Sequence, residues 1–123
     1  MAEKTIDIAS PILSRNERLA DQLRQRFEQT NTYVINVLSS PGSGKTTTIL
    51  GTNERLRDKA GLRCAVIEGD IASDVDAITM KEAGMSAIQI NTGGLCHLEG
   101  NMIMEAVDAF DQAVGLENID VIF

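Results

Sequence analysis

The chain has 123 residues, of which 43% are hydrophobic and 24% are charged, and its formal net charge is −7. This length and composition are typical of one small globular domain and argue against intrinsic disorder. The acidic excess argues against nucleic acid as the main partner, because binding a phosphate backbone needs clustered Lys and Arg. No apolar run approaches the roughly 20 residues of a membrane span, and residues 1–10 do not resemble a signal peptide. We therefore expect a cytoplasmic protein with no membrane partner.

The first predicted element is a helix over residues 10–28. Ser10 can cap its start, and Pro11 suits its first position. Three apolar residues recur at every fourth position and form one face, namely Leu19, Leu23 and Phe27. We expect this face to pack on the domain or on a neighbouring subunit. We accordingly divide the chain into an N-terminal segment, residues 1–30, and a second unit, residues 31–123.

Short apolar runs alternate with helical segments after this first helix. The predicted strands cover residues 33–38, 64–68, 87–90 and 119–123. The predicted helices between them cover residues 46–59, 74–83 and 98–114, and glycines that can end the first two of these helices stand at Gly61 and Gly84. Continuous β-branched runs that alternate with helices are typical of parallel strands covered on both faces. The pattern predicts an α/β fold of three layers around a parallel sheet.

The last predicted strand reaches the final residue, Phe123. Domains usually end in exposed polar sequence, and a parallel strand at a cut end would leave an apolar edge. We therefore expect the fold to be incomplete at its C-terminus.

Residues 39–46, with the sequence SSPGSGKT, lie between a predicted strand and a predicted helix. This is the context that a phosphate-binding P-loop requires. Gly42 and Gly44 let successive backbone N–H groups point at phosphates, and the helix N-terminus adds partial positive charge. Lys45 can reach the β- and γ-phosphates, and the Thr46 hydroxyl can bind Mg²⁺. The motif predicts binding of a purine nucleoside triphosphate with Mg²⁺.

Ser43 and Thr47 complete the predicted phosphate-binding set. Ser39 stands where the general pattern has its first glycine, a position that has little direct contact with phosphate. The alternative interpretation is a Gly-Ser turn between a strand and a helix that happens to include a lysine.

An acidic segment follows the second predicted strand. Because the carboxyl ends of parallel strands surround the ligand in such folds, Asp70 is placed to act on a Mg²⁺-bound water or on the attacking water. Asp76 is a second Mg²⁺ candidate. Ser73 with Asp76 also fits a capping box for the next helix, which would be a purely structural role.

Cys96 and His97 are adjacent in a predicted loop after two glycines, and His97 is the only histidine of the chain. Thiolate and imidazole are ligands that suit Zn²⁺ and Ni²⁺. Two ligands do not complete a site, but a two-fold dimer would supply two of each. Alternatively, a further ligand could lie in the part that we expect to be missing at the C-terminus. An incidental exposed pair remains the alternative, and a Cys–His nucleophile pair is less favoured because no third orienting residue is evident. Cys64, in a predicted strand, is interpreted as a core residue.

Taken together, four segments resemble HypB, a family of SIMIBI-class P-loop GTPases that help to insert nickel into NiFe-hydrogenases. They are SPGSGKTT at residues 40–47, EGD at 68–70, GGLCHLE at 93–99 and NMI at 101–103. The resemblance covers nearly the whole chain from about Arg15. The urease accessory GTPase UreG is similar, but its metal motif typically has a proline between the cysteine and the histidine.

The resemblance implies a GTPase that dimerises in a nucleotide-dependent way, works with other hydrogenase maturation proteins and carries Ni²⁺ or Zn²⁺ at the dimer interface. It implies that Cys96 and His97 are ligands of that metal. It also implies that Lys45 and Asp70 act in hydrolysis, and that Asp70 belongs to the Mg²⁺ and switch region, with Asp76 as a further candidate. Three features of the family are absent from this sequence. They are the cysteine-rich N-terminal nickel site, the acidic residue and switch segment with a second metal-binding cysteine that follow the last strand, and the guanine-reading Asn-Lys-x-Asp motif.

Three alternatives stay open on the sequence alone. A urease-type nickel GTPase would use the same fold. A small-molecule kinase would need arginines that converge on the transferred phosphate, whereas the arginines after Lys45 are on the helix leaving the P-loop or at a strand start. A module that binds metal without nucleotide hydrolysis would depend on Cys96 but not on Lys45.

Overall fold

Four parallel strands form the centre of the structure, a computed structural model that describes residues 9–37, 44–69, 75–90 and 100–123. The elements in chain order are α1 (Ala9–Thr30), β1 (Tyr33–Val34), α2 (Lys45–Ala60), β2 (Cys64–Gly69), α3 (Val75–Glu82), β3 (Ser86–Ile90), α4 (Gly100–Ala113), the 3₁₀ helix η1 (Leu116–Asn118) and β4 (Val121–Ile122). The strand order is β1-β4-β2-β3, and each neighbouring pair is parallel.

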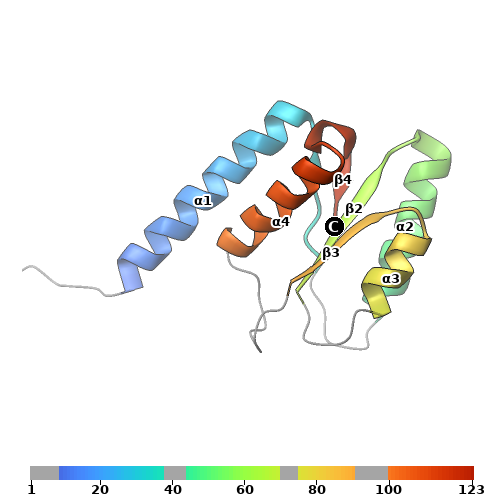
Figure 1. The fold of residues 1–123 in the computed structure, drawn as a ribbon, viewed down its shortest axis with the longest axis horizontal. Helices are drawn as coiled ribbons and strands as arrows, with labels where there is room; N and C mark the ends of the chain where they lie inside the picture. Colours follow the sequence, from blue (N-terminus) through green and yellow to red (C-terminus); the bar gives the residue numbers. More distant parts are fainter. Residues whose placement is uncertain (1–8, 38–43, 70–74, 91–99) are drawn as a thin grey trace, which may run out of the picture.

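Helices cover both faces of this sheet (Figure 1). Helices α1 and α4 lie side by side on one face, and α2 and α3 lie on the other. The predicted three-layer α/β fold with a parallel sheet is therefore confirmed. Each α-helix of the described chain is also too short or too polar to cross a membrane.

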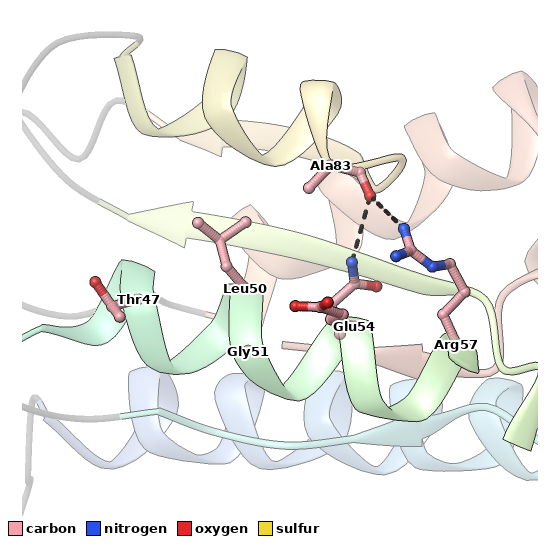
Figure 2. Close-up of a pocket in the computed structure, with 7 residues that line it drawn as sticks. Thr47, Leu50, Gly51, Glu54, Arg57 and Ala83 are labelled. Atoms are coloured by element: carbon pink, nitrogen blue, oxygen red, sulfur yellow. Dashed lines mark hydrogen bonds between the residues drawn. The ribbon is translucent and has the colours of Figure 1, made fainter. Parts of the chain in front are cut away.

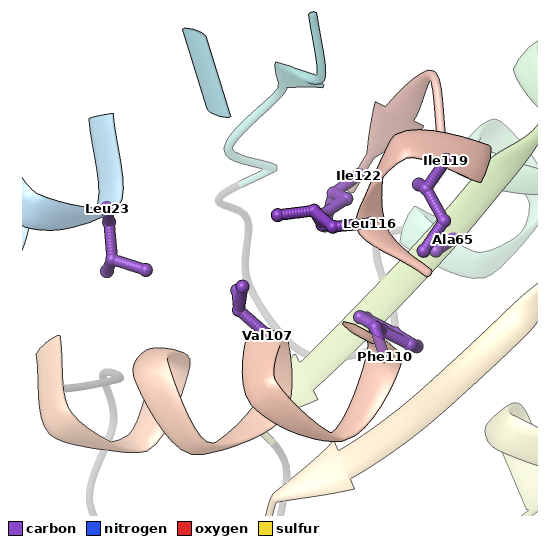
Figure 3. Close-up of a cluster of buried hydrophobic side chains, with 7 residues drawn as sticks. All are labelled: Leu23, Ala65, Val107, Phe110, Leu116, Ile119 and Ile122. Atoms are coloured by element: carbon purple, nitrogen blue, oxygen red, sulfur yellow. The ribbon is translucent and has the colours of Figure 1, made fainter. Parts of the chain in front are cut away.

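Each face of the sheet has its own apolar core. The core under α1 and α4 consists of Leu23, Ala65, Val107, Phe110, Leu116, Ile119 and Ile122 (Figure 3). The core under α2 and α3 consists of Ile49, Cys64, Val66, Met80, Met85 and Val121. Neighbouring residues of one strand enter opposite cores because side chains alternate across a sheet. Cys64 is thus a core residue, as the sequence predicted, and Met80 and Met85 lie in the same core.

Helix α1 is longer than predicted at both ends. It begins at Ala9, so Ser10 is a helical residue and not the cap. It continues to Thr30 because Asn31 takes a left-handed conformation, with φ of 54°, and ends the helix there. Asn tolerates this conformation better than most residues. Thr32 is then buried, and its hydroxyl donates to the backbone oxygen of Ile119 at 3.0 Å.

Strands β1 and β4 are shorter than predicted. Val34 lies opposite Ile122, so the β1 ladder extends only as far as β4 does. Strand β4 begins at Val121 and not at Ile119, after η1 forms a turn over Leu116–Asn118. Both β4 residues are buried and the strand lies between two neighbours, so the predicted buried central strand is confirmed.

Candidate functional site

The carboxyl ends of the strands meet at one edge of the sheet. Gly69, the last residue of β2, lies opposite Ile90, the last residue of β3. Because β1 and β2 are both parallel to β4, the chain after β1 leaves at this edge as well. In open parallel sheets this edge is where ligands bind.

The start of α2 has the geometry of an anion-binding site. Gly44, the residue before the helix, has φ of 90° and ψ of 22°, a conformation that strongly favours glycine. The N–H of Thr48 donates to the backbone oxygen of Gly44 at 3.0 Å, which is the first turn of the helix. The N–H groups of Lys45, Thr46 and Thr47 precede that bond, so they have no partner within the helix. Together with the helix dipole, these three donors favour an anion such as phosphate.

The side chains at this helix start are accessible. Lys45 and Thr46 are half-buried, and Thr47 is exposed. The first turn of α2 thus carries an ammonium group and a hydroxyl that are not fully buried, the residue types that the predicted phosphate-binding motif requires. The other two predicted members of the motif, Gly42 and Ser43, lie outside the described residues.

Of the predicted acidic residues and the Cys-His pair, the structure describes the backbone position of Asp76 alone. Asp70 follows β2 directly and lies outside the described residues. Asp76 is the second residue of α3, which begins just after residues 70–74. Cys96 and His97 also lie outside the described residues, between β3 and α4. Their roles stay predictions.

No three His, Cys, Asp or Glu side chains in the described ranges come close enough together to hold a metal ion. Cys64 is buried at the start of β2, the end of the strand opposite the candidate site. Burial raises the pKa of its thiol, and the negative charge of Asp120 raises it further. Cys64 is therefore a poor metal ligand where it stands, because the thiolate is the ligating form.

A shallow pocket of about 480 Å³ lies along the flank of α2 (Figure 2). Asn53 and Arg57 each donate to the backbone oxygen of Ala83 at 3.4 Å, which ties α2 to the end of α3. Of the predicted phosphate-binding residues that are described, only Thr47 lines this pocket. The pocket thus lies along α2 toward the end of α3 and reaches the predicted phosphate-binding set only at Thr47.

The fold and this helix start define a class. A parallel sheet between two helical layers, with a Gly-Lys-Thr helix start at the carboxyl edge, is the arrangement of P-loop nucleotide-binding proteins. The sequence profile described as "CobW/HypB/UreG, nucleotide-binding domain" matches residues 33–123. The chain belongs to this family.

Curated relatives and solved structures agree with that assignment. The chain is 40% identical to the hydrogenase/urease maturation factor HypB of Helicobacter hepaticus, over 98% of this chain and 48% of the relative. It is 44% identical to the hydrogenase maturation factor HypB of Escherichia coli K12, over 84% of this chain and 35% of the relative. A crystal structure of Helicobacter pylori HypB in complex with nickel is similar, with a TM-score of 0.76 and 38% identity over 88% of this chain and 48% of that chain. The chain therefore spans about half the length of HypB from Helicobacter hepaticus and from Helicobacter pylori J99.

Proposed function

We propose that this chain is the nucleotide-binding part of a cytoplasmic GTPase that delivers nickel for NiFe-hydrogenase maturation. The observation that carries the proposal is the start of α2 at the carboxyl edge of a parallel sheet, where left-handed Gly44 precedes a first turn whose N–H groups have no partner within the helix. Such a helix start favours an anion. Membership of the CobW/HypB/UreG family and the relatives named as maturation factors support it.

The residues present fit a nucleoside triphosphate with its metal ion. The N–H groups of Lys45, Thr46 and Thr47 would bind phosphate oxygens together with Gly42 and Ser43, and the Lys45 ammonium group would neutralise charge on the β- and γ-phosphates. The Thr46 hydroxyl, with Asp70 and Asp76, would hold Mg²⁺. When bound, Mg²⁺ supplies charge stabilisation for phosphoryl transfer.

Hydrolysis would need one residue that orients water. Asp70 directly follows β2 at the edge where α2 begins, so we assign it to that role. Lys45 would stabilise the charge that develops on the phosphates as water attacks the γ-phosphorus and GDP leaves.

Nickel or zinc would bind as cargo at Cys96 and His97. Thiolate and imidazole suit both ions. This pair supplies two ligands, so a homodimer that brings two pairs together would complete four-coordinate binding. The similar crystal structure from Helicobacter pylori is that of HypB in complex with nickel, which supports the assignment.

The proposal is tested by metal titration with and without a non-hydrolysable GTP analogue. Wild type should bind about one Ni²⁺ per dimer, the analogue should shift the affinity, and Cys96→Ala should abolish binding. Lys45→Ala should abolish phosphate release. Nickel binding that ignores both the nucleotide and Cys96 would leave a nucleotide-binding protein with no nickel role.

Two alternative functions remain testable in the same experiments. The Helicobacter relatives are named hydrogenase/urease maturation factors, which favours asking whether nickel also reaches urease. A protein that only binds metal would lose Ni²⁺ in Cys96→Ala, keep it in Lys45→Ala and release no phosphate.

A further inference from the structure

Strand β1 lies at one end of the sheet and carries an exposed apolar surface. The strand order is β1-β4-β2-β3, so among the described residues β1 has a neighbouring strand on one side only. Three of the exposed large hydrophobic side chains in the described ranges are consecutive here: Tyr33 is 74% exposed, Val34 48% and Ile35 37%. The other end of the sheet differs, because all five residues of β3 are half-buried. The apolar surface is therefore concentrated at the edge of β1.

Backbone groups of β1 also face away from the sheet at this edge. The N–H of Tyr33 donates to the backbone oxygen of Asp120 at 2.8 Å, and the N–H of Ile35 donates to that of Ile122 at 2.9 Å. Successive residues of a strand point their backbone groups to opposite sides, so the N–H and C=O of Val34 point away from β4. An edge of this kind offers a donor and an acceptor to another strand.

The sequence around β1 has none of the residues that usually keep strand edges apart. Natural sheets protect their edges with lysine and other charged residues or with proline. Residues 31–37, with the sequence NTYVINV, contain no charged residue and no proline. The net charge of −7 makes two chains repel each other at long range, but this edge adds nothing to that repulsion. An uncharged strand edge is thus compatible in charge with a second copy of itself.

We propose that β1 is a self-association surface, at which two copies of this chain pair their β1 strands antiparallel about a two-fold axis. With Val34 opposite the partner's Val34, the two residues exchange both N–H···O bonds. Tyr33 then lies opposite the partner's Ile35 on the same face of the sheet, and pairs of an aromatic and a β-branched residue stabilise antiparallel strands. The register is therefore its own complement.

The geometry of this pairing limits both the size and the strength of the assembly. A two-fold interface uses the same surface of both copies, so pairing closes both β1 edges and stops at a dimer. Three side chains from each copy fall well short of the roughly 800 Å² that each partner of a standard interface buries. The dimer is accordingly weak and depends on the concentration of the chain.

This dimer is distinct from the metal- and nucleotide-dependent dimer proposed above. Its contacts come from β1 alone, so it forms in the presence of a chelator, without nucleotide and in Cys96→Ala. A failure of nickel or nucleotide binding would leave it unchanged. Added salt should strengthen it, because salt screens the repulsion between two chains of charge −7.

Sedimentation velocity at increasing chain concentration, with a chelator and without nucleotide, tests the proposal. Wild type should shift from monomer to dimer. Val34→Pro removes the outward donor but no bond to β4, and the loss of both bonds across the axis should weaken dimerisation about 30-fold. Tyr33→Lys should weaken it about tenfold through loss of the two cross-strand pairs.

Ile78→Lys is the matched control. Ile78 is 53% exposed on α3, which packs against β3 at the other end of the sheet. The substitution makes the same change from apolar to charged, and dimerisation should stay within about twofold of wild type. Urea unfolding checks that each variant is folded, and the high exposure of Tyr33 makes Tyr33→Lys informative even if Val34→Pro fails to fold.

Amide hydrogen exchange at Val34 reports on the same edge directly. Its rate should fall as the dimer forms. Slow exchange already in the monomer would show that another part of the chain covers the edge, and would overturn the proposal. A wild type that stays monomeric, a folded Val34→Pro that dimerises as wild type does, or equal losses in Tyr33→Lys and Ile78→Lys would overturn it as well.

Discussion

Replacing Gly44 by alanine tests two roles of the start of α2, its contribution to stability and its proposed binding of phosphate. The φ angle of 90° at Gly44 lies beyond the usual left-handed region near 57°. A residue with a side chain costs about 1–2 kcal/mol there. An added Cβ atom would meet nothing within 4 Å, so backbone strain is the whole cost and no clash adds to it. We expect Gly44→Ala to lower the free energy of unfolding by about 1–2 kcal/mol.

Gly61 provides a matched control at the other end of the same helix. It also has a left-handed conformation, with φ of 65°, and a Cβ atom added there would likewise meet nothing within 4 Å. Its N–H donates to the backbone oxygen of Arg57 at 3.0 Å, so it ends α2 and lies away from the anion site. Gly61→Ala should cost about 1 kcal/mol for the same physical reason.

Nucleotide affinity should distinguish the two variants. If Gly44→Ala relaxes its backbone, the N–H groups after it turn away from the phosphates, and one lost hydrogen bond to a charged group costs about 1.5–3 kcal/mol. That corresponds to about 10- to 150-fold weaker binding. Titration with a fluorescent GDP analogue measures this, and urea unfolding measures stability. Equal nucleotide affinities in the two variants would refute the assignment of this helix start as the phosphate site.

Three further predictions concern stability and reactivity. Leu116→Ala should lower the free energy of unfolding by about 2–5 kcal/mol, because Leu116 is buried in the core under α4; a loss below about 1 kcal/mol in urea unfolding would contradict this packing. Hydrogen bonds from Arg63 lower the pKa of Asp120, so their stabilisation is present above its ordinary value of 3.8 and is lost as the pH falls through the lowered value. Acid unfolding of Asp120→Asn should therefore depend less on pH in that window, and identical curves would count against the pair. In a Cys96→Ala background, Cys64 should react with iodoacetamide only after urea unfolding, because burial raises the pKa of its thiol; rapid alkylation of the folded protein would show that the core is open.

The order of elements could be predicted because it depends on local patterns. Apolar β-branched runs of four to six residues alternate with helical segments, and that alternation is sufficient for a parallel sheet covered on both faces. The helix ends at Gly61 and Gly84 were also predictable, since both have positive φ angles that favour glycine. These features need no knowledge of which strand lies next to which.

The missed features depend on contacts between distant residues. The sequence did not indicate that Thr32 would be buried, because its hydrogen bond to Ile119 crosses 87 positions of the chain. The short ladder of β1 likewise depends on its partner strand β4. Gly100 lies in the helix predicted over residues 98–114, but its close approach to α1 is visible only once the helices are packed.

The candidate site shows the same division. A contiguous motif can be recognised without tertiary structure, and the start of α2 has the geometry that the motif implies, with Gly44 left-handed and Lys45 in the first turn. The acidic residue Asp70 and the pair Cys96 and His97 belong to other segments, so their arrangement is a tertiary question. Their spacing in the sequence limits how far apart they can lie but does not determine whether they lie close together.

Helix α1 shows why a boundary in sequence need not be a boundary in folding. The division at residue 30 stays a prediction, and the family's nucleotide-binding profile likewise begins after α1, at residue 33. Yet Leu23 of α1 is only 6% exposed and belongs to one cluster with Phe110 and Ile122, and burial of a leucine contributes about 1.5–3 kcal/mol. Arg26 adds polar contacts to α4. The sheet face under α4 is thus completed by a helix outside the shared nucleotide-binding region, which makes α1 part of the folding unit even if the chemistry belongs to the residues after it.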